Sequence, residues 1–215
     1  MSGAQLVDNT AAIVLDLGCG SHLTLFHQFV DLQVQLGHCA VSTADTALCA
    51  DGNGGVTAGG SESDNWAIRA ALHQNRHAGK HIIPTAIEHP AVLSCMKQLE
   101  SQGFEVTYLQ PDQDGCIRTD AFKAALRKDT FLVSVMMVNN EVGSVMPIAQ
   151  MAKLTHKVCP DAIFHTDAVQ GFLKVPFSAK TLGADLITVS SHKIHGPKGI
   201  GALWISPALL KAKKI

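Results

Sequence analysis

A lysine in an unusual setting is the first chemically suggestive residue of this sequence. Lys193 lies in the segment 190–199, which reads SSHKIHGPKG and follows the short apolar run 185–189. A run of that kind predicts a buried strand, so we expect Lys193 to be buried at its end. Burial lowers the pKa of a lysine amine and makes it nucleophilic. These are the conditions that a Schiff-base lysine requires.

Other polar residues lie at the carboxyl ends of predicted strands: His89, Asn140, Asp167 and Gln170. From about residue 56 onwards apolar runs alternate with helical patterns. This predicts an α/β domain of three layers with a mostly parallel sheet. Because ligand groups gather at the carboxyl ends of the strands in such sheets, we expect these side chains and Lys193 to meet in one site.

The elements that must position these residues are predicted from apolar periodicity and turn residues. Residues 51–55 are expected to form a turn, and Ser61 is a natural N-cap for the helix that follows two glycines. Strands are expected at 81–88, 104–109, 130–138, 162–169, 185–189 and 200–205, and helices at 61–77, 90–102, 119–127 and 147–158.

One cofactor would explain these residues together, namely pyridoxal phosphate, which carries an aldehyde, a ring nitrogen and a phosphate. Lys193 would hold the aldehyde covalently, and Asp167 would keep the ring nitrogen protonated so that the ring accepts electrons. His89 would stack on the ring, while Asn140 and Gln170 could donate to its phenolic oxygen.

The phosphate is expected where free backbone N–H groups at a helix start face an anion. Side chains that donate hydrogen bonds would complete its site. Each of the residues also has an ordinary structural alternative, such as a helix cap or a buried imidazole. The expected phosphate ligands are Gly60, Ser61, Ser190 and His192.

The sequence gives weaker indications of two other sites. His73 and His77 lie one helical turn apart, but no carboxylate completes a metal site, so we expect no metal. The run that ends in Gly18-Cys19-Gly20 resembles the first motif of S-adenosylmethionine methyltransferases. A lone Gly-x-Gly is a weak signal, because the motif normally carries a further glycine and a later acidic residue.

Composition narrows the function classes. The 215 residues carry a net charge of −1, with no basic stripe, which argues against nucleic acid and anionic membranes as partners. There is no apolar run of spanning length and no N-terminal signal pattern, so a cytoplasmic protein is expected. The six cysteines contain no Cys-x-x-Cys pair, which favours reduced, mostly buried thiols over disulfides or a zinc site.

Several spaced motifs together resemble the cysteine desulfurases of the class V aminotransferase family. The region around the lysine is the most specific of them. It is joined, in the same order along the chain, by four others. These are GGSESDN at 59–65, EHPAV at 88–92, VNNEVG at 138–143 and HTDAVQG at 165–171.

This resemblance implies a fold type I enzyme that depends on pyridoxal phosphate and acts as a homodimer. It implies the conversion of L-cysteine to L-alanine, with Lys193 removing the Cα proton and His89 assisting proton transfer. An enzyme cysteine thiolate would then take the substrate sulfur as a persulfide. The sulfur would pass to an acceptor or to an iron–sulfur scaffold protein.

The sequence departs from the family pattern in places. None of the cysteines matches the family's sulfur-accepting position, and the small C-terminal domain is expected to be absent after residue 215. Residues 1–55 are expected to be a divergent segment packed on the large domain 56–215, and Ser61 stands where threonine is common. The alternatives left open are a selenocysteine lyase or aminotransferase of the same family, and a catalytically silent cofactor-binding module.

Overall fold

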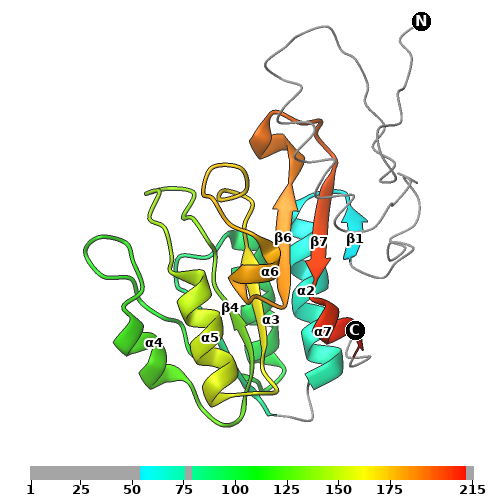
Figure 1. Cartoon of the computed structure of the whole chain (residues 1–215). Coiled ribbons are helices and arrows are strands. Elements are labelled where there is room, and N and C mark those ends of the chain that lie inside the picture. The colour runs from blue at the N-terminus through cyan, green and yellow to red at the C-terminus, as the bar shows by residue number, and fades with distance from the viewer. Residues whose placement is uncertain (1–53, 76–78, 212–215) are drawn as a thin grey trace, which may run out of the picture.

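The computed structural model of the chain describes residues 54–75 and 79–211. Their centre is a seven-stranded sheet in the order β1-β7-β6-β5-β4-β2-β3 (Figure 1). The strands are β1 (Gly54–Thr57), β2 (His81–Pro84), β3 (Glu105–Val106), β4 (Thr130–Ser134), β5 (Ile163–Asp167), β6 (Leu186–Ser190) and β7 (Gly201–Ile205).

The strands β2 to β6 pair in parallel, while β7 runs antiparallel to both of its neighbours, β6 and β1. Parallel strands covered on both faces are composed almost wholly of apolar residues. In β4 all five residues are buried, and the three central ones, Phe131, Leu132 and Val133, are apolar. The prediction of a mostly parallel α/β sheet is confirmed.

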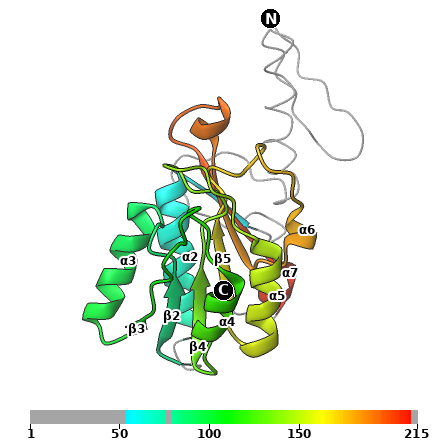
Figure 2. The ribbon, with the colours of Figure 1, turned by 90° about the vertical axis from the view of Figure 1, so that its left-hand side faces the viewer.

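Helices cover both faces of the sheet, as Figure 2 shows, with α2 and α3 on one side and α5 and α6 on the other. The three-layer prediction is therefore confirmed. The helices are α2 (Gly60–Asn75), α3 (Pro90–Ser101), α4 (Thr119–Ala125), α5 (Ile148–Val158), α6 (Ala179–Leu182) and α7 (Pro207–Lys211), with a 3-10 turn η1 at Ser191–Ile194.

The core consists of two apolar clusters, one on each face of the sheet. On one face, Ala67, Ile68 and Ala71 of α2 pack against buried strand residues, since their spacing places them on a single side of the helix. On the other face, Phe122 of α4 is fully buried. Burial of a side chain of this size stabilises the fold by about 2–3 kcal/mol. These layers hold the strand ends rigidly in place.

The turn predicted for residues 51–55 is wrong at its end, because Gly54 and Gly55 begin strand β1. The reason is packing: a Cβ on Gly55 would lie 2.4 Å from the ring of Trp66, so the strand can approach α2 only with glycine there. The short helices α6 and α7 were not predicted, and β2 ends four residues earlier than expected.

Two predictions about the beginning of the chain lie outside the described residues. These are the divergent segment, apart from its last two residues, and the Gly18-Cys19-Gly20 motif. Within the described ranges, no helix is long and apolar enough to cross a membrane.

Candidate active site

A cavity of about 510 Å³ lies where the carboxyl ends of the parallel strands meet the start of α2. The volume falls in the range of small-molecule and cofactor sites. Eight of the nine predicted site residues line it: Gly60, Ser61, His89, Asn140, Asp167, Gln170, His192 and Lys193. The ninth, Ser190, bonds to one of these eight. The structure thus brings the predicted residues together, while their roles remain predictions.

The start of α2 forms one wall of the cavity. Helix α2 begins at Gly60, so the prediction of Ser61 as the N-cap is wrong and Ser61 lies in the first turn. The carboxylate of Glu62 turns back to accept the N–H of Ala58, two residues before the helix, at 2.5 Å. A Cβ on Gly201 of β7 would lie 2.6 Å from the Gly59 carbonyl carbon. This close backbone approach fixes the helix start against the sheet.

Lys193 lies in the 3-10 turn η1, directly after β6. The expectation that Lys193 is buried is wrong, since its side chain is exposed and lines the cavity. The turn explains the difference: it directs Ser191 and Ile194 into the protein, and His195 closes it with a left-handed backbone at φ 63°. The lysine is thereby presented to the cavity instead of being packed in the core.

Ser190 and His192 form a pair beside the lysine, with 2.7 Å between Ser190 Oγ and His192 Nδ1. Ser190 is buried, and His192 is exposed at the cavity. When the serine hydroxyl donates to Nδ1, the Nε2–H is left to donate to a ligand. The structural alternative, in which His192 is a buried imidazole, is therefore wrong.

His89 has two features at once. It is the N-cap of α3, where its Nδ1 accepts the Ala91 N–H at 3.2 Å, and its exposed ring lines the cavity. Pro90 follows at the first helical position, as predicted. The helix-entry role and a role in the cavity are therefore compatible, because the cap uses only one ring nitrogen.

Asp167 ends β5 and is 5% exposed. Its Oδ1 accepts the Val169 N–H at 2.8 Å, which fixes the orientation of the carboxyl group. Burial raises the pKa of Asp167, while the Val169 amide and nearby His89 oppose that shift. A buried, oriented carboxylate suits a cationic or hydrogen-bond-donating ligand group.

Asn140 and Gln170 lie at the rim of the cavity. Asn140 is presented by a turn that Asn139 organises, because the Oδ1 of Asn139 accepts the backbone N–H groups of Glu141 and Val142, each at 2.9 Å. The Oε1 of Gln170 accepts from Lys174 Nζ at 3.0 Å. That bond leaves the amide N–H groups of Gln170 available to donate.

Sequence reasoning missed two buried carboxyl groups beside Asp167: Asp64, which lines the cavity, and Glu88. Asp64 lies on the same face of α2 as Gly60, Ala67 and Ala71, at spacings of three and four residues. That position within a buried stripe was the available signal. Glu88 gave no comparable signal, since only the tertiary fold buries it.

Glu88 is buried with imperfect partners. Its Oε1 accepts from the Thr85 hydroxyl at 2.6 Å and from the Met136 N–H at 2.8 Å, while Oε2 has no hydrogen-bond partner. Burial raises the pKa of Glu88 from 4.5 to about 8, despite these hydrogen bonds. The folded protein therefore binds this proton more tightly than the unfolded chain does.

This shift predicts that stability falls as pH rises from about 4.5 to about 8, because unfolding releases the proton in that window. The contribution of Glu88 is on the order of 4 kcal/mol across the window. Urea unfolding of the Glu88→Gln variant should show a much smaller loss of stability between pH 5 and pH 8.5 than the wild type. The exposed Glu141→Gln variant is the control, and equal slopes for all three proteins would contradict the assignment.

Metal and thiol chemistry have little basis among the described residues. No group of three or more His, Cys, Asp or Glu side chains there could hold a metal ion. Of the two histidines that were considered as a metal pair, His77 lies outside the described residues, and His73 lies exposed on α2.

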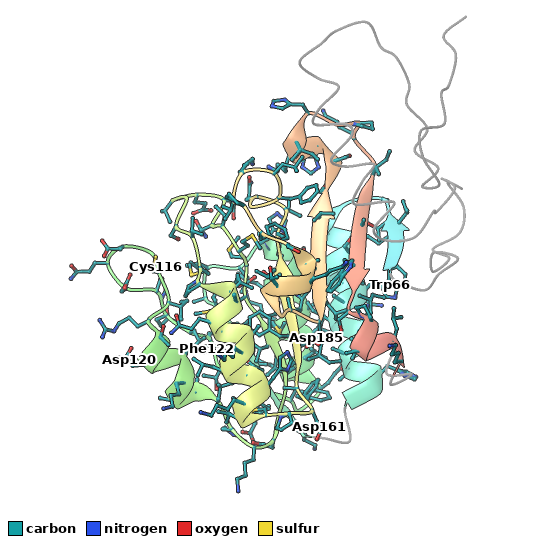
Figure 3. All side chains as sticks on the ribbon, in the orientation of Figure 1. Trp66, Cys116, Asp120, Phe122, Asp161 and Asp185 are labelled. Carbon is teal, nitrogen blue, oxygen red and sulfur yellow. The ribbon has the colours of Figure 1, made fainter. Side chains whose placement is uncertain are left out.

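The three described cysteines are free thiols, and none of them lines the cavity. Cys95 donates to Asn65 Oδ1 at 3.0 Å and Cys159 to the Arg127 carbonyl at 2.9 Å. Burial raises the pKa of both thiols, which makes them poor nucleophiles. Figure 3 places Cys116 in the loop before α4, on the side of the molecule away from β1.

Comparison with known proteins bears on the chain from β1 onwards. The family profile described as "Aminotransferase class-V" matches residues 56–214. "Cysteine desulfurase IscS" of Anaeromyxobacter dehalogenans (strain 2CP-C) is 48% identical over 149 residues, covering 69% of this chain and 36% of the relative. The protein of the same name from Pseudomonas fluorescens (strain Pf0-1) is 51% identical over 150 residues, covering 70% of this chain and 37% of the relative.

Two solved structures are also similar to this chain. The structure titled "SspA in complex with cysteine" has a TM-score of 0.67 at 40% identity and covers 71% of this chain and 44% of that one. "NIFS-LIKE PROTEIN" has a TM-score of 0.70 at 36% identity and covers 74% of this chain and 44% of that one. The chain thus spans a little over a third of the length of the curated relatives it matches.

Proposed function

The chain belongs to the class V aminotransferase family, and from this membership we propose that it binds pyridoxal phosphate and serves the release of sulfur from L-cysteine. The observation that carries the proposal is a single cavity lined by both the exposed amine of Lys193 and the buried carboxyl of Asp167. An aldehyde needs the first group and a basic ring nitrogen needs the second.

The polarity of the cavity fits this cofactor. Its buried wall carries the acidic side chains Asp64 and Asp167, whereas the exposed Ser61 and His192 supply hydrogen-bond donors near the start of α2. The first wall suits a protonated ring nitrogen and the second suits a phosphate. A Cβ on Gly60 would lie 2.8 Å from a methyl group of Val169, so glycine keeps the space between helix and sheet open.

When bound, the cofactor supplies an electron sink for the carbanion at the substrate Cα. The chain's own residues have separate tasks around it. Asp167 holds a proton at the ring nitrogen, and His89 covers a ring face. Ser61, His192 and the first N–H groups of α2 bind the phosphate, and Ser190 orients His192 through their 2.7 Å hydrogen bond.

Lys193 performs the proton transfer in this proposal. Its Nζ would hold the aldehyde of the cofactor and, when free, would accept the proton from the Cα of L-cysteine. The exposed position of Lys193 favours this exchange, because the side chain can move between a covalent and a free state without unpacking the core. Asn140 and Gln170 donate to the phenolic oxygen.

An absorbance measurement tests the cofactor assignment. Protein supplied with pyridoxal phosphate and then desalted should retain a visible band that changes on addition of L-cysteine. Desalted protein without such a band would overturn the proposal. Matched amounts of bovine serum albumin, treated in the same way, control for nonspecific attachment to surface lysines.

A second candidate function is a cofactor-binding module without sulfur transfer. It is favoured by the position of the described cysteines, none of which lines the cavity. Sulfide release from L-cysteine separates the two candidates, and on this basis we expect the 215-residue chain alone to release little or none. Robust turnover would instead show that another cysteine accepts the sulfur.

Further parts of the proposal come from the family resemblance. They comprise a homodimeric assembly, a cytoplasmic location and delivery of sulfur to an acceptor or iron–sulfur scaffold protein. The division into a large domain at 56–215 and a divergent segment before it also stays a proposal. Sedimentation of the purified protein would test the dimer directly.

A further inference from the structure

Three buried carboxyl groups from separate elements gather at the cavity, and two of them, Asp64 and Asp167, line it. Asp64 comes from α2, Glu88 from the segment between β2 and α3, and Asp167 from the end of β5, and they are 1%, 4% and 5% exposed. The negative charges of Asp167 and Glu88 add to the effect of burial in raising the pKa of Asp64, and Asp167 also raises the pKa of Glu88. No lysine or arginine in the described part of the chain forms an ion pair with any of them.

Three ionised carboxylates at this depth would be strongly destabilising, because each charge loses its hydration and repels the others. The partners of each group indicate where protons reside. Asp167 has an oriented backbone N–H on Oδ1 and His89 nearby, both of which favour its ionised form. By contrast, Asp64 Oδ1 and Glu88 Oε2 have no hydrogen-bond partner.

His165 does not supply the missing positive charge. Its Nε2 lies 3.6 Å from Asp64 Oδ1, but the ring is fully buried and desolvation lowers its pKa to about 3. Nδ1 lies 2.9 Å from Ser134 Oγ, and Nε2 lies 3.0 Å from Thr188 Oγ1. The ring is therefore neutral near pH 7, and each of its nitrogens has a hydroxyl partner.

The surroundings of Asp64 are neutral. Burial raises the pKa of Asp64, and the Thr188 hydroxyl is the one group that opposes this rise. Asp64 thus lies beside the neutral ring of His165 and its hydroxyl partners, and no lysine or arginine of the described residues forms an ion pair with it.

We propose that Asp64 is a proton-holding residue of the site, which stays neutral at pH 7 and so leaves the negative charge of the acidic cluster on Asp167. The link to the cofactor rests on the proposed function, since Asp167 would face the ring nitrogen. The assignment of the proton to Asp64 does not depend on the proposed function, because it is argued from residues of the chain alone. The other titratable groups around the cavity are Glu62, Glu88, His89, His192 and Lys193.

Infrared spectroscopy of the cofactor-free protein at pH 7 tests this assignment. A protonated carboxyl group has a carbonyl stretch separate from that of a carboxylate, and ¹³C-labelled aspartate shifts only the aspartate signal. We expect one isotope-shifted protonated band from the labelled wild type, lost in Asp64→Asn. We also expect one unshifted band, lost in Glu88→Gln. The exposed Asp114→Asn variant should keep both bands.

Each possible outcome either supports or overturns the assignment of the proton to Asp64. Absence of an isotope-shifted band in the wild type would show that Asp64 is ionised and would overturn the proposal, without need of any variant. A band that survives Asp64→Asn but disappears in Asp167→Asn would place the proton on Asp167 and overturn it as well. A band from Asp64 in a protein that fails to retain pyridoxal phosphate would support the proton assignment while contradicting the proposed function.

Discussion

Replacing Lys193 with alanine is expected to abolish covalent retention of pyridoxal phosphate and to slow exchange of the substrate Cα proton by about 10³-fold. Among the residues that line the cavity, Lys193 supplies the one primary amine. The variant should fold normally, because the side chain is exposed. Loss of function with an unchanged melting temperature is therefore the expected pattern.

Two measurements check this prediction. Borohydride reduction followed by peptide mass analysis should locate the cofactor on the peptide that contains Lys193 in the wild type. Exchange of the L-alanine Cα proton with solvent deuterium, followed by NMR, does not require a sulfur-accepting cysteine. Lys198→Ala, in the same loop and also exposed, is the matched control. The cofactor assignment fails if Lys193→Ala keeps the label and the exchange rate of the control.

Replacing Asp167 with asparagine is expected to slow the same exchange by about 10²- to 10³-fold, because a fixed charge that stabilises the reacting state is removed. Covalent retention of the cofactor should persist, since Lys193 is unchanged. Asparagine has nearly the same shape and can still accept the Val169 N–H at Oδ1. The orientation of the side chain is thereby preserved while its charge is lost.

The chain offers a closely matched control for this variant. Asp112 Oδ1 accepts the N–H of the residue two positions later at 3.0 Å, in the same local geometry as Asp167, but it is exposed and remote from the cavity. Asp112→Asn should leave both cofactor retention and exchange unchanged. An Asp167→Asn variant with wild-type exchange would rule out a charged partner for the ring nitrogen.

Much of the fold could be predicted because periodicity and turn residues agree over the region from β2 to β7. Pro90 at the start of α3 and the buried run that forms β4 are examples. The short helix α6 could not be found in this way, since four residues carry no periodic signal. Strand β1 was missed because its glycines are required by the Trp66 ring and only the tertiary fold shows that contact.

The residues that make up the site could be predicted from the sequence, but their burial and exposure could not. The position of Asp167 at a strand end was readable because parallel strands bring their carboxyl ends together. The exposure of Lys193 was not, because it depends on a 3-10 turn after β6 that the apolar run before it does not specify. The acidic cluster was missed for a similar reason: burial raises the pKa of Asp64 and Glu88, and burial is a property of the packed molecule.

The antiparallel pairing of β1 with β7 has a consequence for how the protein is made. Thr57 pairs with Gly201, 144 positions further along the chain, and Gly59 and Gly60 lie just beside that pairing. Contacts at such separation form slowly during folding. On a ribosome, β1 must wait, unpaired, until nearly all of the described chain has been synthesised. The helix start that would bind phosphate therefore lacks its contact with Gly201 until β7 has been synthesised, and we expect cofactor loading to follow that point.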